Sequence, residues 1–189
     1  MPQINPAAAA LHPYYHTRYG RRKRHRPQDI CFSPPHNPAM AKLHGQLAQL
    51  NISGGGMPKL PIVEAMVTVD GVKGDWQKNR KFHGGPNRAI CIYSEELYQG
   101  LRDDGVKVNN GDIGENFTTR GLNLQHLKKG DRLKVGECVI ELTDIRVPCF
   151  QLKKWDVDLP ELIVGRSGWV AKVVKEGMVK QGDAISLED

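Results

Sequence analysis

The chain is poor in the features that mark membrane-spanning and exported proteins. No apolar run approaches the roughly 18 residues that a membrane helix requires, and no apolar segment follows the N-terminal arginines as it would in a signal peptide. Cysteine is equally scarce: four cysteines stand at positions 31, 91, 138 and 149, and no two form a Cys-x-x-Cys pair. A structural zinc site or a disulfide framework is therefore not expected. We expect a soluble protein of the reducing cytoplasm, with free thiols and no membrane partner.

Acidic residues are nearly missing from the N-terminal part of the chain. Residues 1–43 carry seven Lys or Arg and a single acid, Asp29, which accounts for the whole net charge of +6. Residues 44–189 contain twenty basic and twenty acidic residues. This balanced body gives no charge argument for nucleic acid as a partner, so only the basic tail could support that alternative.

The first 43 residues are predicted to be a disordered tail. They are rich in Pro and Ala, carry a basic cluster at 18–26 and show no periodic apolar pattern. Met40 begins the segment that leads into the first strand pattern, which suggests the hypothesis that translation starts there. An intact mass of the natively expressed protein would decide this. Residues 44–189 are expected to form one domain, which is long enough to bury a core.

The pattern of the body is rich in β-strands. Short segments with many β-branched residues are bounded by Gly, Asp, Asn or Pro and predict strands at 46–52, 61–71, 88–94, 131–136, 138–147, 169–177 and 184–188. The dipeptide Gly-Asp recurs at 74–75, 111–112, 130–131 and 182–183, where we expect tight turns. One helix is predicted from its N-cap Ser94 to near Gly105, and a short second one over 158–163. Many short strands with few helices predict a mainly antiparallel barrel or sandwich.

Polar segments with glycines interrupt this pattern and are candidates for ligand contact. In the segment 53–59, Gly54, Gly55 and Gly56 allow backbone N–H groups to approach a ligand, and Lys59 adds a positive charge. Such a loop suits a phosphate group. A flexible connector is the alternative.

A second candidate segment is 81–89. Here His83 precedes Gly84 and Gly85, and Arg88 leads into a predicted strand. The histidine could be structural, or the imidazole and guanidinium could contact a ligand beside a bent backbone.

A third candidate segment, 109–121, is polar throughout. Gly114, Glu115, Asn116 and Thr118 offer N–H groups, an acceptor, an amide and a hydroxyl. These groups could contact a ligand rich in heteroatoms, although a solvated loop would have the same composition.

The fourth candidate segment contains a cysteine just after a proline. Pro148 cannot donate to a β ladder, so the strand before it must end there and Cys149 lies where the sheet opens. Arg146 and the lysines at 153 and 154 would favour a thiolate if they lie nearby, and a thiolate binds soft metals or attacks electrophiles. Cys91 and Cys138 alternate with isoleucine and valine and are predicted to be small core residues. Cys149 is thus the one reactive candidate.

These segments, in this order, resemble the MOSC domain family, named for the C-terminal domain of molybdenum cofactor sulfurases. The matching strings are "HGGP" before a β-run, "GDIGENFTTRG", "GDRLKVG", "RVPC" and "GWVAKVVKEGMVKQGD". The resemblance covers residues 44–189 and is closest to the small free-standing bacterial members. It implies a closed β-barrel and a bound molybdenum–molybdopterin cofactor, with Cys149 as the protein ligand to molybdenum.

The resemblance also implies the residues around the cofactor. The Gly-Gly-Pro and Gly-Glu-Asn loops would line its pocket. Gly54 to Gly56, Lys59, Arg88 and Arg146 could serve the phosphate and the metal site. There is no room for the pyridoxal phosphate domain of the sulfurases, so pyridoxal phosphate is not expected.

Three functions remain open at this stage. The first is a molybdenum-dependent reductase of N-hydroxylated substrates, such as hydroxylamino-purines or amidoximes, with protons delivered by His83 or Glu115. Its electrons would come from a separate reductase, because the chain has no flavin, haem or iron–sulfur motif. The second is a carrier of sulfur or of the cofactor through Cys149. The third is nucleic-acid binding through the tail, which deletion of residues 1–39 would abolish. Whether the protein forms a homodimer is left open.

Overall fold

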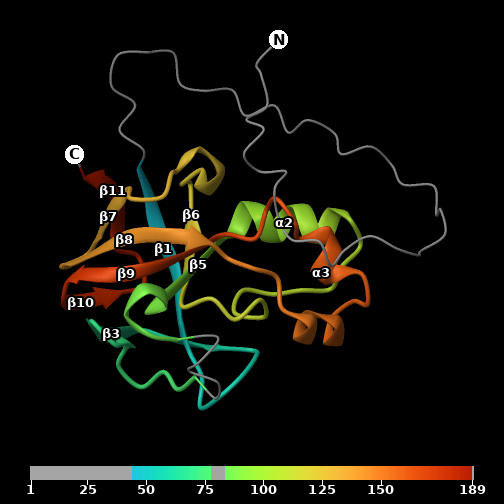
Figure 1. Cartoon of the computed structure of the whole chain (residues 1–189), viewed down its shortest axis with the longest axis horizontal. Helices are drawn as coiled ribbons and strands as arrows, with labels where there is room; N and C mark the ends of the chain where they lie inside the picture. Colours follow the sequence, from blue (N-terminus) through green and yellow to red (C-terminus); the bar gives the residue numbers. More distant parts are fainter. Residues whose placement is uncertain (1–43, 78–83, 189) are drawn as a thin grey trace, which may run out of the picture. The chain divides into compact units, whose positions relative to one another are not determined.

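The computed structural model describes residues 44–77 and 84–188. Seven strands of the larger sheet are hydrogen-bonded in the order β11-β7-β8-β9-β5-β6-β1, and β1 pairs again with β11, so the sheet closes into a barrel. These strands are β1 (His44–Ile52), β5 (Ile90–Ser94), β6 (Phe117–Arg120), β7 (Arg132–Val135), β8 (Cys138–Ile145), β9 (Trp169–Lys175) and β11 (Ala184–Glu188). The prediction of a mainly β, barrel-like fold is confirmed (Figure 1).

Alternation along the strands places the main core inside the barrel. On β5, Ile90 and Ile92 are fully buried in the main apolar cluster, together with Phe117 on β6 and Ile140 on β8. Cys138 belongs to the same cluster, as predicted. Side chains two residues apart share a face of a strand, so the intervening residues of these strands face away from this core.

Smaller strands flank the barrel. Strand β2 (Leu60–Ile62) pairs with the end of β1, whereas β3 (Glu64–Thr68), β4 (Gly71–Val72) and β10 (Gly177–Lys180) form a separate three-stranded sheet. The single strand predicted over 61–71 was therefore wrong: the chain leaves one sheet and enters another, and β2 and β3 are separated by Val63. The sequence also missed β6, which lies inside the segment read as a polar loop, and β10.

The two α-helices of the described residues lie outside the barrel. Helix α2 (Glu95–Asp103) begins at Ser94, whose hydroxyl accepts the N–H of Leu97 at 3.2 Å, as its sequence predicts. Figure 1 shows α2 and α3 (Leu159–Leu162) on one side of the strands. They contribute to a second apolar cluster with Tyr93 of β5, so this side of the barrel wall is covered.

Short 3₁₀ helices complete the described structure: η2 (Pro86–Arg88), η3 (Leu124–His126) and η4 (Phe150–Lys154). Among residues 44–77 and 84–188, the helices are too short and too polar to traverse a bilayer. The strand β5 runs parallel to β6, in contrast to the antiparallel pairing of the other described strands. Its crossover, residues 95–116, therefore passes outside the barrel and carries α2 and the polar segment before β6.

Candidate functional site

A cavity of about 470 Å³ opens on the outer side of the barrel wall. It is enclosed by the glycine loop 53–59, the start of β5, the turn before β6 and the segment between β8 and η4. The structure brings together residues from all four candidate segments. Those that line the cavity are Gly56, Lys59, Arg88, Gly114, Asn116, Arg146 and Cys149.

Cys149 lies at the edge of this cavity. Strand β8 ends at Ile145, and Cys149 is the residue immediately before η4, in an extended conformation. Its thiol is partly exposed, while the neighbouring Val147 and Phe150 are 67% and 75% exposed. The proline that ends the strand pattern thus sets a cysteine at the cavity mouth, on a short helical turn rather than within the sheet.

Cys91 lines the same cavity, which corrects the prediction that it is a core residue. It stands between Ile90 and Ile92, and because both isoleucines point into the barrel, Cys91 points outward. Burial raises the pKa of this thiol, although the positive charge of Arg146 opposes the effect. We therefore expect Cys91 to be a neutral thiol at neutral pH.

The charges on the lining are of one sign. Lys59, Arg88 and Arg146 line the cavity, and none of the other lining residues is acidic. Arg146 donates from Nη2 to the carbonyl of Ile113 at 2.5 Å, whereas its buried Nη1 has no hydrogen-bond partner. A buried donor of this kind requires an acceptor, so an anionic or oxygen-rich ligand would complete the site.

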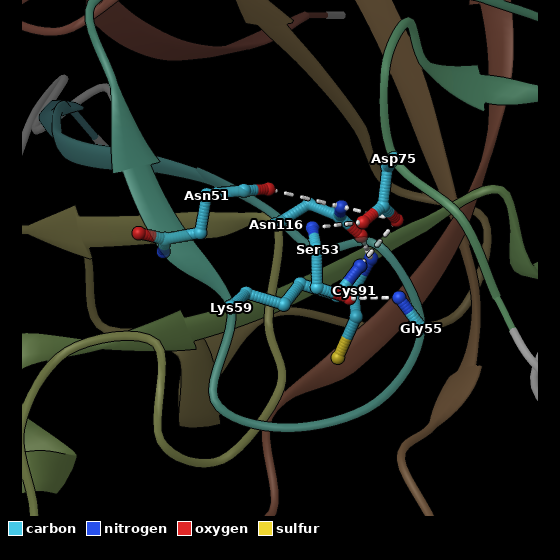
Figure 2. Close-up of polar contacts among 7 residues, drawn as sticks. All are labelled: Asn51, Ser53, Gly55, Lys59, Asp75, Cys91 and Asn116. Atoms are coloured by element: carbon cyan, nitrogen blue, oxygen red, sulfur yellow. Dashed lines mark hydrogen bonds and ion pairs between the residues drawn. The ribbon is translucent and has the colours of Figure 1, made fainter.

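A buried polar network forms the wall behind Lys59. Its ammonium makes an ion pair with Asp75, and the two side chains are 8% and 4% exposed. Asn116 donates to Asp75 at 3.0 Å and to the carbonyl of Asn51 at 3.2 Å, and its amide oxygen accepts the N–H of Cys91 (Figure 2). Asn116 therefore connects three elements of the wall.

Glu115 and Thr118 lie elsewhere. The carboxylate of Glu115 is fully buried and accepts hydrogen bonds from Tyr98 at 2.8 Å, Gly111 N–H at 2.7 Å and Thr118 at 2.6 Å. Burial raises its pKa, and these three donors oppose the rise. Neither residue lines the cavity. Glu115 holds the crossover segment against α2, which is the physical reason why so polar a residue occurs in a buried turn.

The predicted glycines divide between lining and neighbouring positions. Gly54, Gly55, Gly84 and Gly85 are not among the lining residues, although Gly54 and Gly55 belong to the loop that borders the cavity. At Gly56, which has φ of 117° and lines the cavity, an added Cβ would meet nothing within 4 Å, so the backbone there is open to a ligand. His83 lies outside the described residues.

Several residues that line the cavity could not be recognised as ligand-contacting residues from the sequence. Trp76 and Gln77 follow a Gly-Asp turn, and Met57, Ile113 and Val170 look like ordinary apolar residues of turns or strands. Trp76 is 58% exposed. A single exposed apolar side chain is ordinary on a protein surface, so the sequence held no signal that would have placed Trp76 at the cavity.

The fold and cavity define a closed β-barrel with a cationic, cysteine-containing pocket outside its wall. Residues 79–186 match the model of the MOSC domain. The chain belongs to this family, as the resemblance predicted.

Similar proteins agree with this assignment. YiiM of Escherichia coli is 33% identical over 132 residues, which make up 66% of this chain and 59% of YiiM. A Gibberella moniliformis protein named "Reductase" is 35% identical over 126 residues, 62% of this chain but 22% of that protein. The crystal structure of Escherichia coli YiiM superposes with a TM-score of 0.63 at 26% identity, covering 77% of this chain and 70% of YiiM. The sequence match thus spans about three fifths of the length of YiiM.

Proposed function

We propose that the protein binds the molybdenum cofactor in this cavity, with the Cys149 thiolate as the protein ligand to molybdenum, and reduces N-hydroxylated substrates. The observation that carries the proposal is a partly exposed cysteine at the edge of a cavity that has three cationic side chains and no acidic one. Soft thiolates are suitable ligands for such a metal, and cations suit the phosphate of a pterin cofactor.

The residues present fit this group. The orphaned Nη1 of Arg146 and the open backbone at Gly56 can serve phosphate or pterin oxygens. The described residues contain no group of three His, Cys, Asp or Glu side chains that could hold a bare metal ion. A metal at Cys149 would therefore depend on further ligands from the cofactor itself.

When bound, the cofactor would supply two-electron oxygen-atom chemistry. The chain's own part is binding and orientation. Cys149 holds the metal end, Arg146 and Arg88 hold the anionic end, and the buried Ile113 and Val170 exclude water from part of the lining. Glu115 receives no proton-transfer role in this proposal, because its carboxylate is sealed in its own network.

The proposed reductase activity is supported by the similarity to the Gibberella moniliformis protein whose name is "Reductase". Hydroxylamino-purines and amidoximes are the proposed substrates, and a separate electron-donating reductase is the proposed partner, because the sequence has no flavin, haem or iron–sulfur motif.

A carrier is the second candidate. The exposed apolar side chains of Val147 and Phe150 on either side of Cys149 would let a partner protein reach the thiol. In that case Cys149 would accept a sulfur atom as a persulfide from a cysteine desulfurase, or hold the cofactor for delivery.

The test uses full-length protein produced in a host that makes the cofactor. Molybdenum content and pterin fluorescence are measured for the wild type, Cys149→Ser and the matched control Cys91→Ser, which changes the other thiol of the same cavity. Loss of molybdenum in Cys149→Ser alone is expected. Equal molybdenum in all three proteins, or none in the wild type, would contradict cofactor ligation by Cys149.

Turnover and mass then separate the two functions. Cofactor-loaded protein with a chemical reductant should convert an N-hydroxylated purine. The other outcome is that the protein stays inactive while the mass of Cys149 rises by about 32 Da, one sulfur atom, after incubation with a cysteine desulfurase. In that case the carrier function replaces the reductase.

A further inference from the structure

The four Gly-Asp turns share one backbone arrangement. In each, the aspartate N–H donates to the carbonyl three residues earlier, from Asp75 to Val72, Asp112 to Asn109, Asp131 to Lys128 and Asp183 to Lys180. In three of them the aspartate carboxylate also closes its own turn, accepting the N–H of Asn109 at 2.7 Å, Lys128 at 2.8 Å and Lys180 at 2.9 Å. These three aspartates have a local structural role.

Asp75 departs from this pattern. Its carboxylate accepts the N–H of Ser53 at 2.8 Å, the side-chain amide of Asn116 at 3.0 Å and the ammonium of Lys59 (Figure 2). The donors come from the end of β1, the segment before β2 and the turn before β6. All three donor residues line the cavity, whereas Asp75 lies behind them.

The same contacts fix both ends of the glycine loop 53–59. Between these ends, the carbonyl of Met57 accepts a hydrogen bond from the Lys154 ammonium at 2.8 Å. The Met57 side chain lies against Gly114, where an added Cβ would approach it to 2.9 Å. Lys154 belongs to η4, the 3₁₀ helix that follows Cys149 directly. A continuous set of contacts thus leads from Asp75 through the loop to the backbone that carries the cavity thiol.

We propose that Asp75 is a positioning residue of the cavity: its carboxylate ties three segments of the wall together and holds the glycine loop 53–59, and through Lys154 the C-terminal end of η4, in the conformation that receives the ligand. Asp75 does not touch the ligand. The role concerns the shape of the cavity, and it rests on the proposed function only where the molybdenum cofactor is taken as the ligand.

The cysteines of the described residues allow a direct test on the full-length protein without cofactor. Alkylation by neutral iodoacetamide is followed by peptide mass spectrometry, which reads each cysteine separately. Cys149 and Cys91 report on the cavity, and Cys138, inside the barrel core, reports on global opening. Asp75→Asn is compared with the wild type and with Asp131→Asn, the same substitution in a turn that closes on itself.

Release of the loop should speed alkylation of Cys149 and Cys91 in Asp75→Asn by about threefold or more beyond any rise at Cys138, as expected for local opening. Asp131→Asn should leave the rates at Cys149 and Cys91 as in the wild type. Lys154→Met, which breaks the last contact, should raise the rate at Cys149 without raising it at Cys138.

Other outcomes would overturn the proposal. A parallel rise at all three cysteines would show a general loss of stability, and unchanged rates would show that Asp75 holds nothing. Faster alkylation of Cys91 alone would show that Asp75 does not hold the backbone at Cys149. Because Asp75→Asn leaves Lys59 without its partner, the double variant Lys59→Gln/Asp75→Asn, which removes both buried charges, repeats the test if the single variant fails to fold.

A second arm loads the variants with cofactor. Asp75→Asn should retain about a tenth of the wild-type molybdenum per folded protein, as expected for a misplaced supporting residue. If the wild type itself holds no molybdenum, the proposed function fails, while the alkylation rates still decide whether Asp75 positions the cavity.

Discussion

The two faces of the barrel wall differ in chemistry although the same strands build them. The inward face is apolar: Leu47, Ile92 and Ile140 are completely buried in one cluster. On the outer side, buried residues include Lys59, Glu115 and Asn116, each with polar partners. A polar group out of water is tolerated only when it is paired, so the outer side has a specific geometry that the inner side does not need. The residues that stabilise the barrel therefore lie on its inward face, and the residues that shape the site lie on its outer side.

Strand β5 shows this division within three residues. Ile90 and Ile92 point into the barrel, and Cys91 between them points to the cavity. Changes to the inner face should act mainly on the free energy of unfolding, and changes to the outer face mainly on the site. The following predictions test that separation, from the largest expected effect to the smallest.

The largest effect is expected from Ile140→Ala on the inner face. Ile140 is fully buried, and truncation of such a side chain lowers the free energy of unfolding by about 2–5 kcal/mol. Urea unfolding measures this loss. Molybdenum per folded protein should match the wild type; a variant that folds well but loses the metal would show that the two faces are not separate.

Glu115→Gln should lower the free energy of unfolding by about 1–3 kcal/mol near pH 5, because the NH2 end of an amide cannot accept a hydrogen bond from Tyr98 or Gly111, as either oxygen of the carboxyl group can. The cost should shrink at higher pH. Burial raises the folded-state pKa of Glu115 above its ordinary value of 4.5, so the wild type loses stability as pH rises through the raised value, and the variant has no such loss.

Urea unfolding of both proteins at pH 5 and pH 8 checks this sign. A difference in stability that grows with pH would mean that the native state favours the ionised carboxylate, contrary to the effect of burial.

Arg146→Lys should affect the site more than the stability. The variant keeps the positive charge but loses the planar group that reaches Ile113 with one nitrogen and the cavity with another. We expect about a tenfold drop in molybdenum retention and a change of at most about 1 kcal/mol in unfolding free energy, the value of one ordinary hydrogen bond. If the variant and the wild type retained equal amounts of molybdenum, Arg146 would not be one of the residues that bind the anionic group.

The smallest effect is expected from Asp131→Asn. Its carboxylate only closes the turn before β7, by accepting the N–H of Lys128, so the loss should be about 0.5–1.5 kcal/mol. Both metal content and Cys149 alkylation should be unchanged. A cavity effect here would mean that turns remote from the wall also set its shape.

The sequence predicted most of the fold because most of the signals are local. The cap at Ser94, the Gly-Asp turns and the alternating strands depend on neighbouring residues, and the structure contains the cap, the four turns and six of the seven predicted strands. Strand β6 was missed because its residues Thr118 and Thr119 read as loop residues; their burial depends on Glu115 and on partners far along the chain.

The site was predicted less completely. The motif strings pointed to four segments, and each of them contributes at least one residue to the lining of the cavity. Which residue of a segment faces the cavity was not readable: Gly114 and Asn116 do, and Glu115 between them does not. The alternation of Cys91 with Ile90 and Ile92 is visible in the sequence. Without the strand order, however, this alternation does not show which face of the strand lies against the core.

The parallel pairing of β5 and β6 has one more consequence. Since the connection between these strands must run over the outside, its length is not fixed by the closure of the sheet. The part of this connection that tolerates change is its beginning at Asp104 and Gly105, which are exposed, whereas Val106, Val108 and Gly111 are held by the second apolar cluster and by Glu115. Insertions directly after α2 could therefore extend this side of the molecule among relatives without altering any strand register.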